Sequence, residues 1–154
     1  MKKICLISCV KGKNDVASEA CDLYKSTLFS AHVDWAYKVR SFKKEDCRIL
    51  SAEHGLIPMD KYIAPYEKTL NNMSSVEKAK WARKVFQELQ DEFDMSNTEF
   101  VILAGKNYYE NLIPVIKHFE LPEQFKGLPI GKRVQQLHME IREAEEKLKK
   151  ESKG

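Results

Sequence analysis

The residues best suited to chemistry are Glu53 and His54, which stand at the end of an apolar run in Arg48-Ile-Leu-Ser-Ala-Glu-His-Gly-Leu-Ile-Pro58. A histidine beside a carboxylate can act as a general acid or base near neutral pH. Ser51 allows a tight turn before this pair, and Gly55 after it permits a backbone angle that other residues avoid. We therefore expect a functional loop at the carboxyl end of a short buried strand. The alternative is a structural cap, in which the imidazole binds a backbone carbonyl.

A second carboxylate and an aromatic ring follow this loop. The segment from Pro58 to Tyr66 is rich in proline and aromatic residues, which favours an extended connection, and Glu67 comes directly after it. Because Glu53 and His54 are neighbours in the chain, their side chains should diverge. We therefore expect Glu67 or a hydroxyl to orient the imidazole. The ring of Tyr66 is a candidate for stacking on a base.

A polar loop also follows the first apolar run of the chain. It contains Ser8, Cys9, Lys11 and Lys13, and a helix follows. Free backbone N–H groups at a helix start beside two lysines form an anion cradle, so we expect Lys11 and Lys13 to bind phosphate. The alternative is a pair of solvated lysines in a polar turn. Cys9 is a possible nucleophile, since this setting would lower the pKa of its thiol; otherwise it is a small residue at a strand end.

The clearest strand of the chain, residues 98–105, ends in a third loop. Gly105 closes the strand where the next helix begins, so Tyr108 lies at the strand end as a second stacking ring. Tyr24 has the spacing of a core residue, but a buried hydroxyl needs a partner, and it remains a candidate ligand contact. The predicted catalytic residues are His54, Glu53 and Glu67, and the predicted binding residues are Ser8, Cys9, Lys11, Lys13, Tyr24, Ser51, Gly55, Tyr66, Gly105 and Tyr108.

Three apolar, β-rich runs predict the sheet on which these loops stand. The runs cover residues 4–10, 47–51 and 98–105, and the apolar spacing predicts helices over 16–37, 74–93, about 106–116 and from 132 onward. This order is typical of an α/β fold, here a small three-layer parallel sheet of three to four strands with flanking helices and a long C-terminal helix. Right-handed crossovers make the strands parallel, which brings all three loops to one edge.

Length and composition indicate one domain. With 154 residues, 43% of them hydrophobic, the chain can form a single core, which we place in residues 1–145, with 146–154 as a charged, frayed tail. The net charge of +3 allows a polyanionic partner but is far below that of a nucleic-acid packager. The apolar start is too short for a signal peptide, and no run approaches the roughly 20 apolar residues of a membrane span. We expect a cytoplasmic protein without a membrane partner.

The cysteines and histidines predict neither a disulfide framework nor a metal site. The 4 cysteines include no pair at C-x-x-C spacing, and the 4 histidines are scattered singly. Neither a Walker pattern nor G-x-G-x-x-G is present. We therefore expect no metal and no cofactor.

Several motifs occur in a fixed order from the first strand to Gly131. They are Ser8-Cys9-x-Lys11-x-Lys13, Leu23-Tyr24-x-Ser26-x-Leu28-Phe29, Ile49-Leu50-Ser51-Ala52-Glu53-His54-Gly55-Leu56, Ala64-Pro65-Tyr66-Glu67 and Leu103-Ala104-Gly105-x-x-Tyr108. Together they resemble a family of short bacterial and phage proteins of unassigned function. More distantly, the Leu-Ser-x-x-x-Gly-Leu and Pro-Tyr elements resemble the YaaA family of peroxide-stress proteins, which bind DNA. The layout is also similar to the uracil-DNA-glycosylase-like domains of archaeosine-forming enzymes, although the Gly-x-Asp-Pro and His-Pro-Ser-Pro segments of classical uracil excision are absent.

These candidates together predict a nucleotide- or nucleic-acid-directed enzyme that cleaves or exchanges an N-glycosidic bond. In this hypothesis Glu53 or Glu67 stabilises positive charge on the sugar while His54 manages the proton. The partner is a nucleotide-like small molecule or a nucleic acid. The alternative is a non-catalytic module that binds a nucleotide or DNA, and a third possibility is an adaptor that uses the C-terminal helix as a partner surface.

Overall fold

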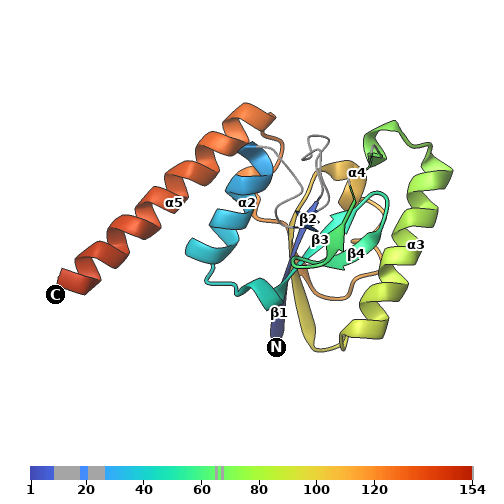
Figure 1. The fold of residues 1–154 in the computed structure, drawn as a ribbon, viewed down its shortest axis with the longest axis horizontal. Coiled ribbons are helices and arrows are strands. Elements are labelled where there is room, and N and C mark those ends of the chain that lie inside the picture. The colour runs from blue at the N-terminus through green and yellow to red at the C-terminus, as the bar shows by residue number, and fades with distance from the viewer. Residues whose placement is uncertain (9–17, 21–26, 65, 67, 154) are drawn as a thin grey trace.

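The computed structural model describes residues 1–8, 18–20, 27–64, 66 and 68–153, and a five-stranded sheet forms its centre (Figure 1). The strands of this sheet are β1 Lys2–Ser8, β3 Cys47–Ser51, β4 Gly55–Pro58, β6 Thr98–Leu103 and β7 Phe119–Glu120. Their order across the sheet is β4-β3-β1-β6-β7. All neighbours run parallel except β4, which pairs with β3 in the antiparallel direction.

The three strands predicted from the sequence form the middle of the sheet. In β1 the side chains from Ile4 to Ile7 are all fully buried, because helices cover both faces of a central parallel strand. Ser8 pairs in register with Leu50 of β3, and Ile7 pairs with Leu103 of β6. These pairs align the carboxyl ends of the three strands.

Helices lie on both faces of the sheet, so the predicted three-layer α/β architecture is confirmed. The helices are α2 Thr27–Lys38, α3 Ser75–Glu92, α4 Lys106–Tyr109 and α5 Ile130–Lys153. In Figure 1, α2 and α5 pack against each other on one side, and α3 lies on the other side next to β4. A capping box starts α3: the hydroxyl of Ser74 accepts from the Glu77 N–H at 3.2 Å, and the Glu77 carboxylate accepts from the Ser74 N–H at 3.3 Å.

The sheet has more strands than the three to four predicted, and it is not purely parallel. β4 follows β3 through a short turn over residues 52–54, and β7 contains only two residues, which is too short for a periodic pattern. A separate pair, β2 Ser18–Glu19 and β5 Tyr62–Ile63, is antiparallel. The predicted helix over 16–37, for which the sequence allows a break near residues 26–27, is therefore wrong at residues 18–19, and the helix α2 begins at Thr27.

The predicted helix over 106–116 is also wrong. The helix α4 ends at Tyr109, and turns occupy residues 110–115, where Pro114 has no N–H to continue a helix. The long C-terminal helix is confirmed and begins at Ile130.

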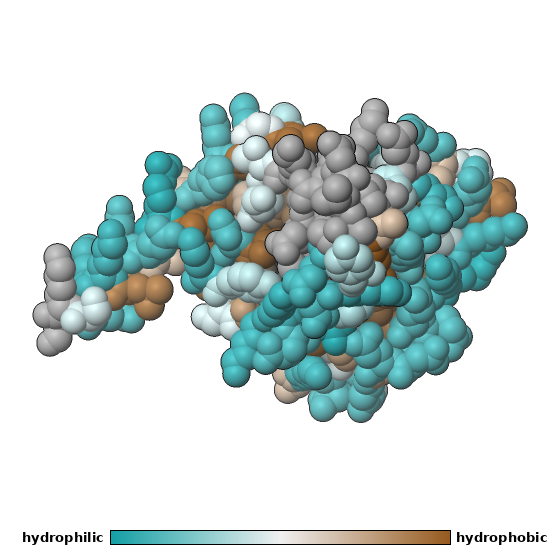
Figure 2. All heavy atoms as spheres, viewed as in Figure 1, coloured by the Kyte–Doolittle hydropathy of each residue, from teal (hydrophilic) through white to brown (hydrophobic). Residues whose placement is uncertain are grey.

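The end of α5 extends away from the rest of the molecule (Figure 1). The carboxylate of Glu145 pairs with Lys38 on α2 at 2.9 Å, and the side chains of residues 146–152 beyond it are exposed. Figure 2 shows that hydrophilic side chains cover most of this projecting part. The chain stays helical to Lys153, and the domain boundary at residue 145 remains a prediction. Among the described helices, none has the length and apolar character that crossing a membrane requires.

Candidate functional site

The carboxyl edge of the sheet brings together the ends of the three central strands. Ser8 ends β1, Ser51 ends β3, and Gly105 follows β6 as the residue that begins α4. Because β1 is parallel to both β3 and β6, these three residues lie at one edge, as the order of elements predicts. Open α/β folds place their ligand sites at this edge.

Ser51 links the turn after β3 to two other parts of the chain. Its side chain is fully buried, its hydroxyl accepts a hydrogen bond from the His54 N–H at 2.9 Å, and it hydrogen-bonds with the Tyr66 hydroxyl at 2.7 Å. The indole Nε1 of Trp81 on α3 donates to the Ser51 carbonyl at 2.8 Å. The Ser51 hydroxyl is therefore engaged in holding the turn and the loop that carries Tyr66.

Gly55 is required by the backbone of this turn. Its φ is +73°, in the left-handed region that favours glycine, as the sequence predicts. A side chain at this position would also collide with the carboxylate of Glu88, which accepts a hydrogen bond from the Leu56 N–H at 3.2 Å. Gly55 thus serves the geometry of the β3–β4 turn, and its place in a binding site remains a prediction.

The imidazole of His54 is half-buried at this edge and packs edge-on against the ring of Tyr66, with ring centroids 5.3 Å apart. Burial lowers the pKa of His54, while Glu53 raises it and Lys61 and Lys84 lower it further. The imidazole is therefore neutral at neutral pH. Neither of its ring nitrogens hydrogen-bonds with a residue in the described part of the chain. Within the described residues, the ring nitrogens of His54 are therefore available to accept a proton from a ligand.

Glu53, by contrast, points to solvent. Its carboxylate is 43% exposed and forms an ion pair with Lys68 at 3.6 Å. The side chains of Glu53 and His54 thus have different partners, as expected for neighbours in a tight turn.

Tyr108 is a core residue at the end of β6. It is 5% exposed and packs edge-on against Trp81, with ring centroids 5.6 Å apart. Its hydroxyl lies 3.5 Å from both the Thr69 hydroxyl and the Leu70 N–H. The ring of Tyr108 therefore supports the loop through Thr69, whereas the partly buried ring of Tyr66 lies beside the imidazole of His54.

Several predicted site residues lie outside the described part of the chain. These are Cys9, Lys11, Lys13, Tyr24 and Glu67. Their proposed roles in binding phosphate, in nucleophilic attack and in orienting His54 remain predictions.

A pocket of about 260 Å³ opens beside Gly105 and contains residues that the sequence analysis did not select. Lys106 and Tyr109 line it, and the sequence could have indicated both residues, because they come directly after the end of a predicted strand. Arg133 on α5 also lines it. Nothing in the sequence indicated Arg133, because only the packing of α5 against α2 returns this helix to the end of β6.

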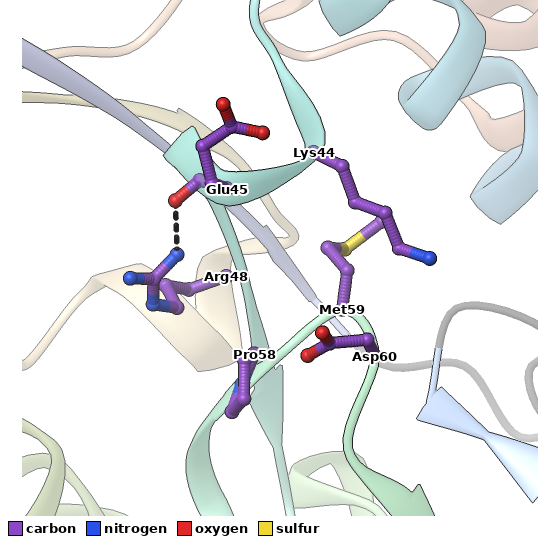
Figure 3. Close-up of a pocket in the computed structure, with 6 residues that line it drawn as sticks. All are labelled: Lys44, Glu45, Arg48, Pro58, Met59 and Asp60. Atoms are coloured by element: carbon purple, nitrogen blue, oxygen red, sulfur yellow. Dashed lines mark hydrogen bonds between the residues drawn. The ribbon is translucent and has the colours of Figure 1, made fainter.

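A second pocket, of about 240 Å³, lies at the opposite edge of the sheet (Figure 3). It is lined by Lys44, Glu45, Arg48, Pro58, Met59 and Asp60. The guanidinium of Arg48 donates to the Glu45 carbonyl at 2.6 Å and forms an ion pair with Glu92. Because its acidic and basic groups are mixed and its arginine is already paired, this pocket is a weaker candidate than the carboxyl edge.

Comparisons with known proteins give one match. The model of a family of unknown function, DUF6884, matches residues 4–139. No curated protein and no solved structure matches the chain. Within the described ranges, no three His, Cys, Asp or Glu side chains are placed to hold a metal ion.

Proposed function

Since this chain belongs to DUF6884, a family of unknown function, we propose from its geometry that it is a nucleotide- or nucleic-acid-directed enzyme. The reaction that we propose is cleavage or exchange of an N-glycosidic bond at the carboxyl edge of the sheet. The observation that carries the proposal is the half-buried imidazole of His54, which has a lowered pKa and no hydrogen-bond partner among the described residues. His54 lies in the turn after β3, at the edge of the sheet where β1 and β6 also end.

In hydrolysis, His54 acts as a general base. A water oxygen forms a bond to C1′ of the sugar, the proton of that water passes to an imidazole nitrogen, and the electron pair of the C1′–N bond leaves with the base. A carboxylate stabilises the positive charge that develops on the sugar. Glu53 can take this role only by leaving Lys68, so Glu67 is the stronger candidate.

The lowered pKa of His54 gives the reaction a defined pH dependence. A general base works in its unprotonated form, so kcat/KM should rise with pH and level off above the pKa of the imidazole. Because burial lowers this pKa, we expect the midpoint below about 6.5, the ordinary value for histidine.

The test is a screen of the full chain against nucleosides, nucleotides and DNA with modified bases, with release of the free base as the readout. His54→Ala should lower kcat by roughly 10²- to 10⁴-fold and leave ligand binding intact. His138→Gln is the matched control, because His138 is exposed on α5 and its replacement should change nothing. Loss of activity in both variants to the same degree would contradict a catalytic role for His54.

A second candidate function is a binding module for a nucleotide-like ligand or DNA, without chemistry. The structure favours it in one respect: the Ser51 hydroxyl and the Glu53 carboxylate already have protein partners. Binding of the screened ligands without turnover by the unmodified protein would support this module and refute the enzyme.

A further inference from the structure

We infer that the pocket beside Gly105 binds the phosphate group of a small organic phosphate, with Arg133 as the main contact. The pocket lies at the carboxyl end of β6, between α4 and the start of α5. The inference goes beyond the proposed function, because His54, Ser51 and Tyr66 do not line this pocket. It also holds whether or not His54 is catalytic.

The guanidinium of Arg133 is half-buried and has no negative partner in the part of the chain that the structure describes. Its Nε donates to Nε2 of His32 at 3.0 Å, its Nη1 donates to the Phe125 carbonyl at 3.3 Å, and it lies 5.3 Å from the centre of the Phe125 ring. Arg133 forms no ion pair with any residue in the described part of the chain, and its Nη2 has no hydrogen-bond partner there. A cation that is partly removed from water is costly unless an anion lies beside it.

Burial lowers the pKa of Arg133, with Tyr109 acting in the opposite direction. This is the effect expected when a cation loses water without gaining a carboxylate. Among the described residues, no carboxylate compensates the positive charge of Arg133.

His32 fixes the direction of the guanidinium. A guanidinium can only donate hydrogen bonds, so Nε2 of His32 must accept and the ring must be neutral. Neutral His32 and the Phe125 carbonyl orient Arg133 without cancelling its charge, and the N–H groups of Nη2 stay available for an oxyanion. Hydrogen bonds between a guanidinium and a phosphate are charge-assisted, so a guanidinium held in one direction suits this ligand.

Two lysines add to the positive charge of the pocket. Lys106 and Lys126 both line it and are exposed, and the described residues that line it include no Asp or Glu. Lys126 pairs at 2.8 Å with Glu123, whose side chain is 85% exposed, so this pair is solvated and weak. The pocket therefore has the charge expected for an anion site.

The walls and the size of the pocket indicate what carries the phosphate. Tyr109 and Phe125 contribute aromatic surface, and Leu121, Pro122 and Leu128 contribute apolar surface. A volume of about 260 Å³ is below the roughly 300–1,000 Å³ of pockets that enclose drug-sized ligands. This combination fits a phosphate monoester that carries a ring and is no larger than a nucleoside monophosphate.

The experiment is isothermal titration of the full chain with inorganic phosphate, a nucleoside monophosphate and the corresponding nucleoside. We expect the phosphate and the nucleotide to bind, the nucleoside to bind at least about tenfold more weakly, and the affinity to fall as salt is added. Arg133→Gln should weaken binding about tenfold or more. Lys106→Gln and Lys126→Gln should each weaken it about two- to fivefold.

The matched control is Lys132→Gln, which removes one positive charge from an exposed position next to Arg133 but outside the pocket. It should change the affinity less than about twofold.

If Arg133→Gln fails to fold, the two exposed lysine variants decide the outcome. The inference is overturned if neither inorganic phosphate nor the nucleotide binds at millimolar concentration. It is equally overturned if the nucleoside binds as well as the nucleotide, or if Lys132→Gln weakens binding as much as Lys106→Gln. His54→Gln should leave phosphate affinity unchanged, so failure of the proposed catalysis is distinguishable from failure of this site.

Discussion

Arg133 donates a hydrogen bond from Nε to Nε2 of His32 across 3.0 Å, and this bond joins α5 to α2 beneath the phosphate pocket that we infer. His32 is buried and neutral. Burial, together with the positive charge of Arg133, lowers the pKa of His32 to about 3. The contact therefore couples folding to pH.

The first prediction is a loss of stability in mild acid. In the unfolded chain His32 takes up a proton below about pH 6.5, whereas in the folded chain it resists protonation down to about pH 3. Between these values the unfolded state binds more protons, so the free energy of unfolding falls as pH decreases, by up to about 1.4 kcal/mol per pH unit. Urea unfolding at several pH values between 7 and 4 measures this fall in the free energy of unfolding. His32→Gln should show a flatter pH dependence, and parallel curves for the two proteins would contradict the assignment.

The second prediction compares two glycines with the same backbone angle. Gly55 has φ +73° and Gly127 has φ +72°, but only at Gly55 would a Cβ meet another group, the Glu88 carboxylate. Gly127→Ala should lower the free energy of unfolding by about 1–2 kcal/mol, which is the cost of a left-handed alanine. Gly55→Ala should cost about 1 kcal/mol more, because it also displaces Glu88 from the Leu56 N–H.

The double variant Gly55→Ala with Glu88→Ala separates the two causes. Without the Glu88 side chain, adding the methyl group should cost no more than it costs at Gly127. If Gly55→Ala and Gly127→Ala lower the free energy of unfolding equally when Glu88 is present, the contact with Glu88 does not affect stability.

The sequence predicted the part of the fold that local patterns control. The apolar runs over residues 4–10, 47–51 and 98–105 identified the three central strands, and the helical spacing over 74–93 identified α3. The order of elements then placed the three strand ends at one edge. These features depend on burial of whole strands and on hydrogen bonds between near neighbours, which is why sequence reasoning reached them.

What sequence reasoning missed depends on tertiary contacts. The residues of β4 were interpreted as a loop, because its four residues, Gly55 to Pro58, carry no alternating pattern of their own. Trp81 belongs to the predicted helix over 74–93, but only the packing of α3 against β4 brings its indole to the Ser51 carbonyl, to which it donates. Arg133 reaches the end of β6 only because α5 packs on α2, and no local pattern contains this information.

The third prediction concerns the hydrogen bond between Ser51 and Tyr66. Tyr66→Phe removes one partner of the 2.7 Å bond and should cost about 1 kcal/mol of stability. Ser51→Ala should cost more, about 1–3 kcal/mol, because it also leaves the His54 N–H without its acceptor. A double-mutant cycle measured by urea unfolding should give a coupling of about 0.5–1.5 kcal/mol between the two hydroxyls. Additive losses would show that the bond does not contribute.

The fourth prediction concerns the ion pair between Arg40, just after α2, and Glu120 on the edge strand β7. Two parallel hydrogen bonds of 2.9 Å join them, and the bonds from Arg40 lower the pKa of Glu120. Because the Glu120 side chain is 37% exposed, solvent screens the pair, and we expect Glu120→Gln to cost about 1 kcal/mol at pH 7.

The contribution of this ion pair to the free energy of unfolding is lost as pH falls. An ion pair in which a basic group has a raised pKa would instead lose its contribution as pH rises. A carboxylate with a lowered pKa stabilises the folded state above its unfolded pKa, near 4.3, and this contribution is lost as pH falls through the folded value. The difference between the unmodified protein and Glu120→Gln should therefore shrink below about pH 4. Glu145→Gln is the control, since Glu145 also lies 2.9 Å from its partner Lys38 but makes a single hydrogen bond to it and is 45% exposed, and its loss should be smaller. A difference that persists at pH 3 would mean that packing of the Glu120 side chain, and not its charge, holds β7 to the sheet.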